Sequence, residues 1–403
     1  MQLRIAIVTD LHAYDTASGP AAPSHLSIHL KENDKTQHPV TALLDLIQRE
    51  PIRADLLISA GDMADKAQEQ GIRYAWTAIH RIKAALHATE VGAVPGNHDL
   101  DSRHLQSESD PDPKGMLQDL SPPFPTDDEA LNDRFWSQNF VLLERDNFRL
   151  LMLNSSAFHG GVSSEIDHGR ISSRTLARID KCLSQSPNRL VNILLVHHHP
   201  IQHEEMGLGA TDVMRQGQLL MALLSRGDFG EWLVIHGHKH HPKLSYGLGG
   251  SATPTVFSAG SLCASLYLQL QTQARNQFYV MTINSDDIQR YGLVGRIEAW
   301  DWASGLGWQK AGPASGLPAK CGFGYRTNIP VFARTVAARV HSGLQRDKFA
   351  PWSWALTEFP PLDFLIPADL DFLIRVLRQE RVDVVRDDGG VPKQIGIVPG
   401  GAN

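Results

Sequence analysis

Short apolar runs alternate with amphipathic segments through about the first 285 residues of the chain. The segment 74–86 (YAWTAIHRIKAAL) has apolar residues at spacings of three and four, which predicts a helix. The other helices predicted in this part of the chain are 43–48, 176–183 and 218–224. The apolar runs predict strands at 4–9, 56–59, 91–94, 147–153, 192–196 and 232–235. Strands that alternate with helices in this way are typical of an α/β fold with parallel strand pairings.

Two irregular segments interrupt this alternation, at 13–39 and at 101–128. The second is rich in Pro, Asp and Ser, which favour loops over regular structure. Each segment is a candidate to close over a substrate. The alternative is a solvated surface loop, which would have the same kind of sequence. Farther along, the patterns at 254–258 and 277–283 alternate as antiparallel strands do.

The composition and charge narrow the class of protein. Of the 403 residues, 42% are hydrophobic and 20% are charged, as in ordinary globular proteins. The formal charge of −6 provides no overall attraction to nucleic acid or to an anionic membrane. The cysteines Cys182, Cys263 and Cys321 form neither a disulfide framework nor a CxxC site. The chain starts directly with a predicted strand and has no run of about 18 apolar residues, so we expect a cytoplasmic protein without a membrane span.

Five short motifs rich in imidazole, carboxylate and carboxamide groups each follow a predicted strand. They read Asp10-Leu11-His12, Gly61-Asp62, Gly96-Asn97-His98-Asp99, His197-His198-His199-Pro200 and Gly237-His238-Lys239-His240. Borderline and hard divalent metals accept such mixed nitrogen and oxygen ligands. One motif alone could be a chance match or a cluster of structural histidines. Together they indicate a metal site, and the set is large enough for two ions.

In this order the motifs resemble those of the calcineurin-like metallophosphoesterase superfamily, over about residues 1–285. The resemblance implies an α/β fold, namely a four-layer αββα sandwich of two mixed sheets whose second sheet the strands at 254–258 and 277–283 would complete. It also implies a catalytic domain at 1–299. Residues 300–403 are then a C-terminal extension or a small accessory module, with five tryptophans and one helix-like run at 370–380.

The resemblance further implies two divalent metal ions, with manganese, iron and zinc as candidates that suit such ligands. The implied ligands of the first ion are Asp10, His12, Asp62 and His240, and those of the second are Asp62, Asn97, His198 and His238. Asp62 would bridge the ions, since a carboxylate can give one oxygen to each. A hydroxide held between the ions would be the nucleophile.

The histidine triplet requires a choice of ligand. The superfamily places the ligand two residues before the proline, which selects His198. Strand alternation through 192–197 puts His197 and His199 on the opposite face from His198. A buried structural role is expected for His236.

His98 resembles the catalytic histidine of the superfamily. It would bind the phosphoryl group or protonate the leaving oxygen, as a residue that titrates near neutrality can do. Asp99 would orient His98, although a helix N-cap is the alternative for Asp99. Lys239 lies between two expected ligands and is expected to point away from them. Solvated surface, rather than substrate contact, is expected for Asp65, Lys66 and Arg103.

The leading hypothesis is a metal-dependent phosphodiesterase that acts on a small, nucleotide-like phosphoester. The motif spacing and the GNHD form of the third motif look closest to the branch that hydrolyses cyclic nucleotides and glycerophosphodiesters. A DNA exonuclease or endonuclease of the same superfamily is an alternative that would use 300–403 as a cap. That segment has no dense stripe of Lys and Arg, so nucleic acid is not the favoured partner. The other alternative is a non-catalytic scaffold, but here every ligand position is filled. The sequence specifies neither the substrate nor the oligomeric state.

Overall fold

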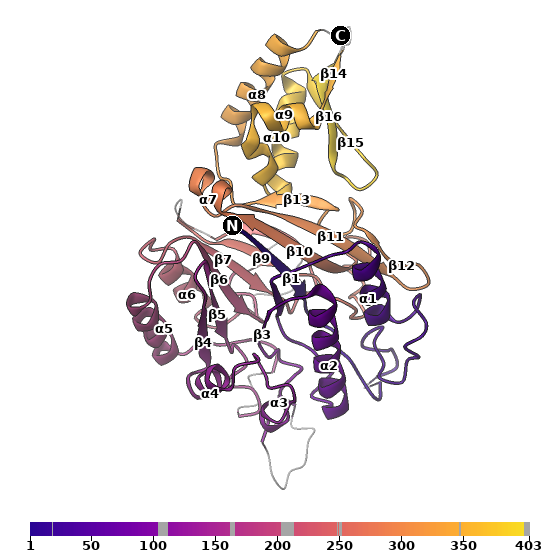
Figure 1. The fold of residues 1–403 in the computed structure, drawn as a ribbon, viewed down its shortest axis with the longest axis vertical. Helices are drawn as coiled ribbons and strands as arrows, with labels where there is room; N and C mark the ends of the chain where they lie inside the picture. The colour runs from indigo at the N-terminus through magenta and orange to yellow at the C-terminus, as the bar shows by residue number, and fades with distance from the viewer. Residues whose placement is uncertain are drawn as a thin grey trace.

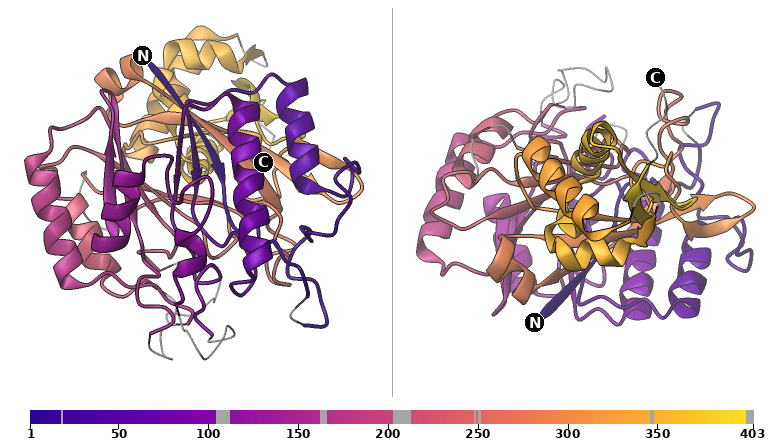
Figure 2. Two further views of the ribbon diagram at one scale, coloured as in Figure 1. Left: turned by 60° about the horizontal axis from the view of Figure 1, so that its bottom comes forward. Right: turned by 90° about the horizontal axis from the view of Figure 1, so that it is seen from above.

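Two β-sheets pack face to face and helices cover their outer faces, so the chain forms the expected four-layer αββα sandwich (Figure 1). Figure 2 shows one helical layer on either side of the strands. The structure is a computed structural model. It describes residues 1–17, 19–103, 112–161, 166–202, 213–247, 249, 252–345 and 348–398.

The first sheet contains the strand that begins the chain. Its described strands are β1 (Gln2–Val8), β2 (Leu56–Ser59), β3 (Glu90–Ala93), β10 (Asn276–Asn284), β11 (Gly295–Ala303), β12 (Gly307–Lys310) and β13 (Lys320–Phe323). Their order is β12-β11-β10-β1-β2-β3, and β13 pairs with β11. β1, β2 and β3 run parallel, whereas β10 runs antiparallel to β1. The parallel strands therefore all end at one edge of the sheet, where the first three motifs follow them.

The second sheet supplies the last two motifs. Its described strands are β4 (Phe140–Glu144), β5 (Phe148–Leu153), β6 (Val191–Val196), β7 (Trp232–His236), β8 (Lys243–Tyr246) and β9 (Thr255–Ser258). Their order is β4-β5-β6-β7-β9-β8, with parallel pairing in the centre and antiparallel pairing at both edges. Every residue of β5, β6 and β7 is buried. Continuous burial is typical of parallel strands that are covered on both faces.

Helices cover the outer face of each sheet. Those on the first sheet are α1 (Pro39–Arg49) and α2 (Glu69–Leu86), and those on the second are α5 (Ser173–Gln185) and α6 (Gly217–Leu224). The other described helices of this part of the chain are α3 (Gly115–Gln118), α4 (Glu129–Gln138) and α7 (Ser285–Tyr291). Side-chain caps begin three of these helices: His38 accepts the Thr41 N–H at α1, Asp128 accepts the Leu131 N–H at α4, and Ser172 accepts the Thr175 N–H at α5. Such caps satisfy backbone donors that a helix start otherwise leaves unpaired.

Alternation along the strands separates two hydrophobic cores. On β5, Leu150 and Met152 pack between the two sheets, whereas Leu151 and Leu153 pack toward the outer helices, together with Ile179 of α5. Burying a side chain of this size contributes about 1.5–3 kcal/mol. A shift of β5 by one residue would exchange these two sets, so the packing fixes the register that aligns the strand ends.

All of the helices and strands predicted through residue 235 are present. The prediction for 277–283 was wrong in one respect, because β10 lies in the first sheet and not in the second. β10 pairs antiparallel with β1 (Ile5 lies opposite Met281), and strand alternation by itself does not indicate which sheet a strand joins. β9 does lie in the second sheet, where it runs antiparallel to β8, as predicted, and parallel to β7. Part of the irregular segment 101–128 lies outside the described residues.

The C-terminal residues form a unit with its own hydrophobic core. Its elements are α8 (Ile329–Gly343), β14 (Phe349–Pro351), α9 (Trp352–Glu358), the 3-10 helix η3 (Pro360–Phe364), α10 (Pro367–Gln379), β15 (Val382–Arg386) and β16 (Pro392–Ile397). The three strands form a separate sheet in the order β14-β16-β15. The expected domain boundary at 299/300 falls inside β11, so we propose that this unit begins after β13.

The C-terminal unit lies at the end of the sandwich where β1 begins (Figure 1). An ion pair between Arg296 of β11 and Asp363 of η3 joins it to the first sheet. The first motif follows the opposite end of β1, and the seven residues of β1 span about 23 Å. The unit and the five motifs are therefore at opposite ends of the strands. Among the described residues, every helix is too short or too polar to cross a membrane.

Candidate metal centre

The five motifs meet in loops that carry an unusual backbone conformation. Asp10, His12, Asp62, His238 and His240 all have positive φ, between 46° and 76°. This region is disfavoured for residues other than glycine and costs about 1–3 kcal/mol at each position. Backbone hydrogen bonds tie the first two motifs together, with Asp10 N–H donating to Gly61 and His12 N–H to Asp62. Strained residues of this kind cluster at functional sites.

Glycines let the loops approach one another closely. Gly61 has φ +99°, and a Cβ at this position would lie 2.5 Å from the backbone nitrogen of Gly96. A Cβ on Gly96 would overlap the carboxylate of Asp62, and one on Gly237 would overlap that of Asp10. The glycines of the second, third and fifth motifs thus make room for the carboxylates.

A first set of ligand atoms converges around His12. Its Nε2 lies 3.2 Å from Nε2 of His240 and 3.5 Å from Oδ2 of Asp62. Nε2 of His240 lies 3.3 Å from Oδ1 of Asp10. Atoms at such separations surround a point roughly 2 Å from each, which is the length of a bond from zinc to nitrogen or oxygen.

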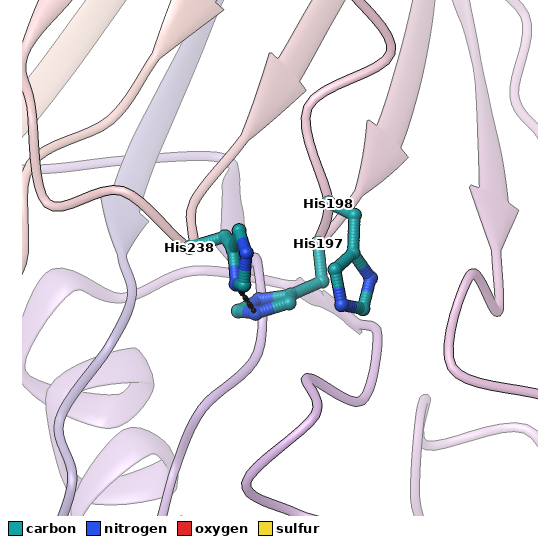
Figure 3. Close-up of side chains that lie close together, drawn as sticks. All are labelled: His197, His198 and His238. Atoms are coloured by element: carbon teal, nitrogen blue, oxygen red, sulfur yellow. Dashed lines mark hydrogen bonds between the residues drawn. The ribbon is translucent and has the colours of Figure 1, made fainter. Parts of the chain in front are cut away.

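A second set converges around His197, which the sequence did not select. Nε2 of His197 lies 3.2 Å from Oδ1 of Asn97, 3.2 Å from Nδ1 of His238 and 3.4 Å from Oδ2 of Asp62. Figure 3 shows the rings of His197 and His238 turned toward each other. Nδ1 of His197 donates to the backbone oxygen of Ala60 at 2.7 Å, so in the neutral ring the lone pair of Nε2 faces the other three atoms.

His198 lies beside this second set. Its Nδ1 is 2.8 Å from the hydroxyl of Ser155, and its ring centroid is 4.6 Å from that of His238. Its Nε2 is buried and makes no hydrogen bond within the described part of the chain. His198, the sequence candidate, and His197 are therefore both placed to serve as ligands. Of these two histidines, His197 is the one whose Nε2 contacts Asp62, at 3.4 Å from Oδ2. His236 is buried, with Nδ1 3.0 Å from the backbone oxygen of Gly237.

The two sets share one carboxylate oxygen. Oδ2 of Asp62 faces both His12 and His197. Oδ1 of Asp62 accepts the backbone N–H of His98 at 2.8 Å. The expectation that Asp62 offers one oxygen to each ion differs from this geometry, because a backbone donor already occupies Oδ1.

The electrostatics keep most of these imidazoles neutral. Burial lowers the pKa of His12 to about 3 and holds the pKa values of His198 and His238 well below the usual range. Burial alone would also lower the pKa of His197, but the nearby carboxylate of Asp62 raises it to about 9. In the protein without metal, a proton on His197 therefore balances part of the charge of Asp62.

His98 sits on the rim of the site. Its ring centroid is 4.7 Å from that of His12, and its Nδ1 is 3.1 Å from Oδ1 of Asp65. Asp99, expected to orient His98, instead accepts the backbone N–H groups of Met63, Ala64 and Gly96. Asp99 thus joins the second and third motifs, and Asp65 is the carboxylate that contacts the His98 ring. Asp65 is buried, contrary to the expected solvated surface.

A cavity of about 340 Å³ opens onto both ligand sets. Besides the ligand candidates, its lining residues are His98, Arg103, Asp167, His168, Lys239 and Tyr267. Lys239 was expected to point away from the site and instead lines it. Arg103 was expected on solvated surface and also lines it, whereas Lys66 is not among the lining residues and contacts His98 through its backbone N–H. Burial lowers the pKa of Lys239 to about 8, against the opposing effect of Asp167.

The donor atoms fit divalent metal ions. Groups of three or more metal-ligating residues with converging atoms include Asp10 with His12 and His240, and His197 with His198 and His238. Mixed carboxylate, imidazole and carboxamide donors suit manganese, iron and zinc.

Comparisons with known proteins agree with the fold and the motifs. A family model described as calcineurin-like phosphoesterase matches residues 3–242. A second model, wHTH-Calcineurin_assc, named for a winged helix-turn-helix, matches 321–379. No curated protein matches the sequence.

Several solved structures are similar to the chain. The purple acid phosphatase of yellow lupin (Lupinus luteus) matches with a TM-score of 0.48 and 14% identity, over 77% of this chain and 53% of that one. PhoD matches with a TM-score of 0.47 and 9% identity, over 80% of this chain and 69% of that one. The NAD nucleotidase of Haemophilus influenzae matches with a TM-score of 0.36 and 12% identity, over 94% of this chain and 60% of that one. The chain thus spans about half the length of the lupin enzyme.

Proposed function

The chain belongs to the calcineurin-like phosphoesterase family, and from this premise we propose that it hydrolyses a phosphodiester at a centre of two divalent ions. The observation that carries the proposal is Oδ2 of Asp62, which faces two separate sets of ligand atoms. A single ion would need only one of these sets.

We assign the ligands by the distances among their donor atoms. The first ion would be held by Asp10, His12, Asp62 and His240, and the second by Asp62, Asn97, His238 and His197. His198, the ligand predicted from the superfamily, is the alternative for the last position. Two bound ions would neutralise the phosphoryl charge and supply a hydroxide near neutral pH.

His98 is the proposed proton donor to the leaving oxygen. Its Nδ1 lies 3.1 Å from the buried carboxylate of Asp65, which orients the ring. Nε2 is then the atom that meets the substrate. Asp99 would contribute indirectly, because it holds the loop from which His98 projects.

The cavity offers a place on each side for the two substituents of a diester. A row of rings runs from His98 through His12 and His240 to Tyr267, with neighbouring centroids 4.7, 5.1 and 5.7 Å apart. The leaving group would lie at the His98 end. Tyr267 is half exposed at the other end, and its open face suits a planar group such as a nucleobase. These features support a nucleotide-like substrate.

The alternatives of nuclease and scaffold receive less support. A cap for nucleic acid should cover the metal centre, whereas the C-terminal unit lies at the other end of the strands. Cations on and beside α10 are engaged within the unit, since Arg378 pairs with Asp383 and Arg386 pairs with Asp371. A scaffold would have no need to keep five strained residues at positive φ.

The test is a panel of substrates assayed with manganese, iron and zinc in turn. The panel contains phosphomonoesters, cyclic nucleotides, acyclic diesters, and single- and double-stranded DNA. We expect metal-dependent hydrolysis with diesters as the best substrates. A preference for DNA would favour the nuclease, and hydrolysis of none with any metal would refute the enzyme.

A further inference from the structure

The cavity wall carries two cationic side chains that the proposed metal ligands and His98 do not account for. Arg103 follows the third motif and Lys239 lies within the fifth, yet both line the same cavity. Among the described lining residues, Asp167 is the only carboxylate besides the proposed bridge, Asp62. Apart from Asp62, which faces the proposed ions, the described wall thus carries two cationic side chains and one carboxylate.

Arg103 has hydrogen-bonding capacity to spare. Its Nη2 lies 3.4 Å from Nε2 of His98 and 3.7 Å from Oδ1 of Asp167, so neither contact is a short one. Its Nη1 is buried and makes no hydrogen bond to any residue that the structure describes. A guanidinium carries five N–H donors in a fork that matches phosphate oxygens. Leaving a buried donor unpaired is unfavourable, so a phosphate oxygen here would gain more than one on an open surface.

Lys239, which belongs to the fifth motif, lines the same cavity as Arg103. The residue is 9% exposed, although lysine is seldom buried without a reason. Its two neighbours in the chain, His238 and His240, are proposed ligands of different ions, so Lys239 is held beside both. Asp167 interacts electrostatically with Lys239 as well as with Arg103.

Asp167 interacts only weakly with the two cationic side chains, so a bound anion could replace it. Its side chain is 74% exposed, and its closest contact with Arg103 is 3.7 Å, which is longer than a hydrogen bond between charged groups. Exposed pairs of this kind contribute little free energy. A phosphate oxygen in the cavity would compete with Asp167 for the same two cations.

We propose that Arg103 and Lys239 bind the non-bridging oxygens of the phosphoryl group, and that Asp167 is the competing counter-ion in the substrate-free protein. The proposal rests on the proposed phosphoesterase function and names the residues that recognise the charge of its substrate. It assigns the pair to the phosphoryl group itself, which every phosphoester shares, and Tyr267 to the substituent.

The test measures inorganic phosphate binding to the manganese-loaded protein by calorimetry, with bound metal counted in each sample. Arg103→Gln and Lys239→Met should each weaken phosphate binding about tenfold, because each removes a hydrogen bond between charged groups. Asp167→Asn should strengthen it about two- to fivefold, because the competing charge is gone. Lys181→Met and Asp133→Asn, which change exposed residues on α5 and α4, should match the parent.

The predicted changes in phosphate affinity have opposite signs in the cation variants and in Asp167→Asn, which distinguishes phosphate recognition from a structural role. General damage to the fold would weaken binding in all three cavity variants, so a weaker or unchanged affinity in Asp167→Asn would overturn the proposal. Parallel assays on the best substrate of the panel keep the two proposals apart. If the parent hydrolyses its substrate while phosphate affinity is equal in all variants, the cation pair fails and the phosphoesterase stands. If no phosphoester is hydrolysed, the phosphoesterase fails, and the phosphate affinities still decide whether the pair binds the anion.

Discussion

Nε2 of His197 lies 3.4 Å from Oδ2 of Asp62, and both side chains are buried. Asp62 follows a strand of the first sheet and His197 a strand of the second, so this contact joins the halves of the sandwich. In the protein without metal it is an ion pair, and in the proposed centre both atoms are ligands of the second ion. The same oxygen of Asp62 also faces His12.

Replacing the shared carboxylate should impair both ion sites. Asp62→Asn keeps the size of the side chain but removes a charge that offsets the repulsion between two cations about 3.5–4 Å apart. We expect weaker binding of both ions and low activity even at high manganese concentration. Asp10→Asn should weaken mainly the first ion and Asn97→Ala mainly the second. Titration with manganese, with bound ions counted, tests this, and two ions bound at parent affinity in Asp62→Asn would exclude the bridge.

The histidine triplet can be resolved by a matched pair of variants. Given the distances, His197→Ala should bind about one ion fewer than the parent, whereas His198→Ala should retain both ions. His198 contacts Ser155, so its loss should lower the melting temperature more than the metal content. Elemental analysis of both proteins decides the matter. The reverse pattern would restore His198 as the ligand predicted from the superfamily.

Proton transfer should separate from metal binding at His98. His98→Ala should keep its metal and lose roughly 10²–10⁴-fold in kcat, the usual contribution of a general acid. Asp65→Asn should show a smaller loss and a shifted pH profile, because Asp65 positions the ring of His98. Asp99→Asn should chiefly lower stability, since that carboxylate accepts three backbone N–H groups. A missing ion in His98→Ala would show that His98 is a ligand instead.

Stability without metal should depend on pH through His197. Its pKa is raised from 6.5 to about 9, so the proton stabilises the folded protein fully below pH 6.5, and this contribution is lost as the pH rises toward 9. The slope of melting temperature against pH in the chelated protein should therefore be lower than in a variant without His197. The buried neutral histidines His12, His198 and His238 contribute in the opposite direction in both proteins, because only their unfolded forms bind protons near pH 6.5. Manganese affinity should rise over the same range, because the ion displaces the proton.

Scanning fluorimetry from pH 6.5 to 8 is the cleanest measurement of this effect. Lys239, whose pKa burial lowers to about 8, loses its proton over the upper part of this range, and this raises stability with pH in the parent and in the control variant alike. His197→Gln is the control, and its melting temperature should rise more with pH, or fall less, than that of the parent. Equal slopes in the two proteins would assign the effect to another group.

The sequence by itself determined the fold class and most of the ligand candidates. The ends of buried parallel strands can be located in the sequence because such strands are apolar throughout. The residues that follow these strands meet at one edge of each sheet. The five motifs could therefore be placed at strand ends before any coordinates, and their resemblance to the superfamily named Asp10, His12, Asp62, Asn97, His238 and His240 as ligand candidates. Local pattern could not assign β10 to a sheet, since alternation looks alike in either one.

Only the tertiary structure brought His197, Asp65, Arg103 and Lys239 to the site. Strand alternation predicted that His197 points away from the ligands. β6 ends at Val196, however, and the alternation no longer applies beyond the end of a strand. Lys239 faces the cavity because both of its neighbours have positive φ, a conformation that spacing does not reveal. The sequence names residues that can bind a metal or a phosphate, whereas the backbone path between the strands decides which of them face the cavity.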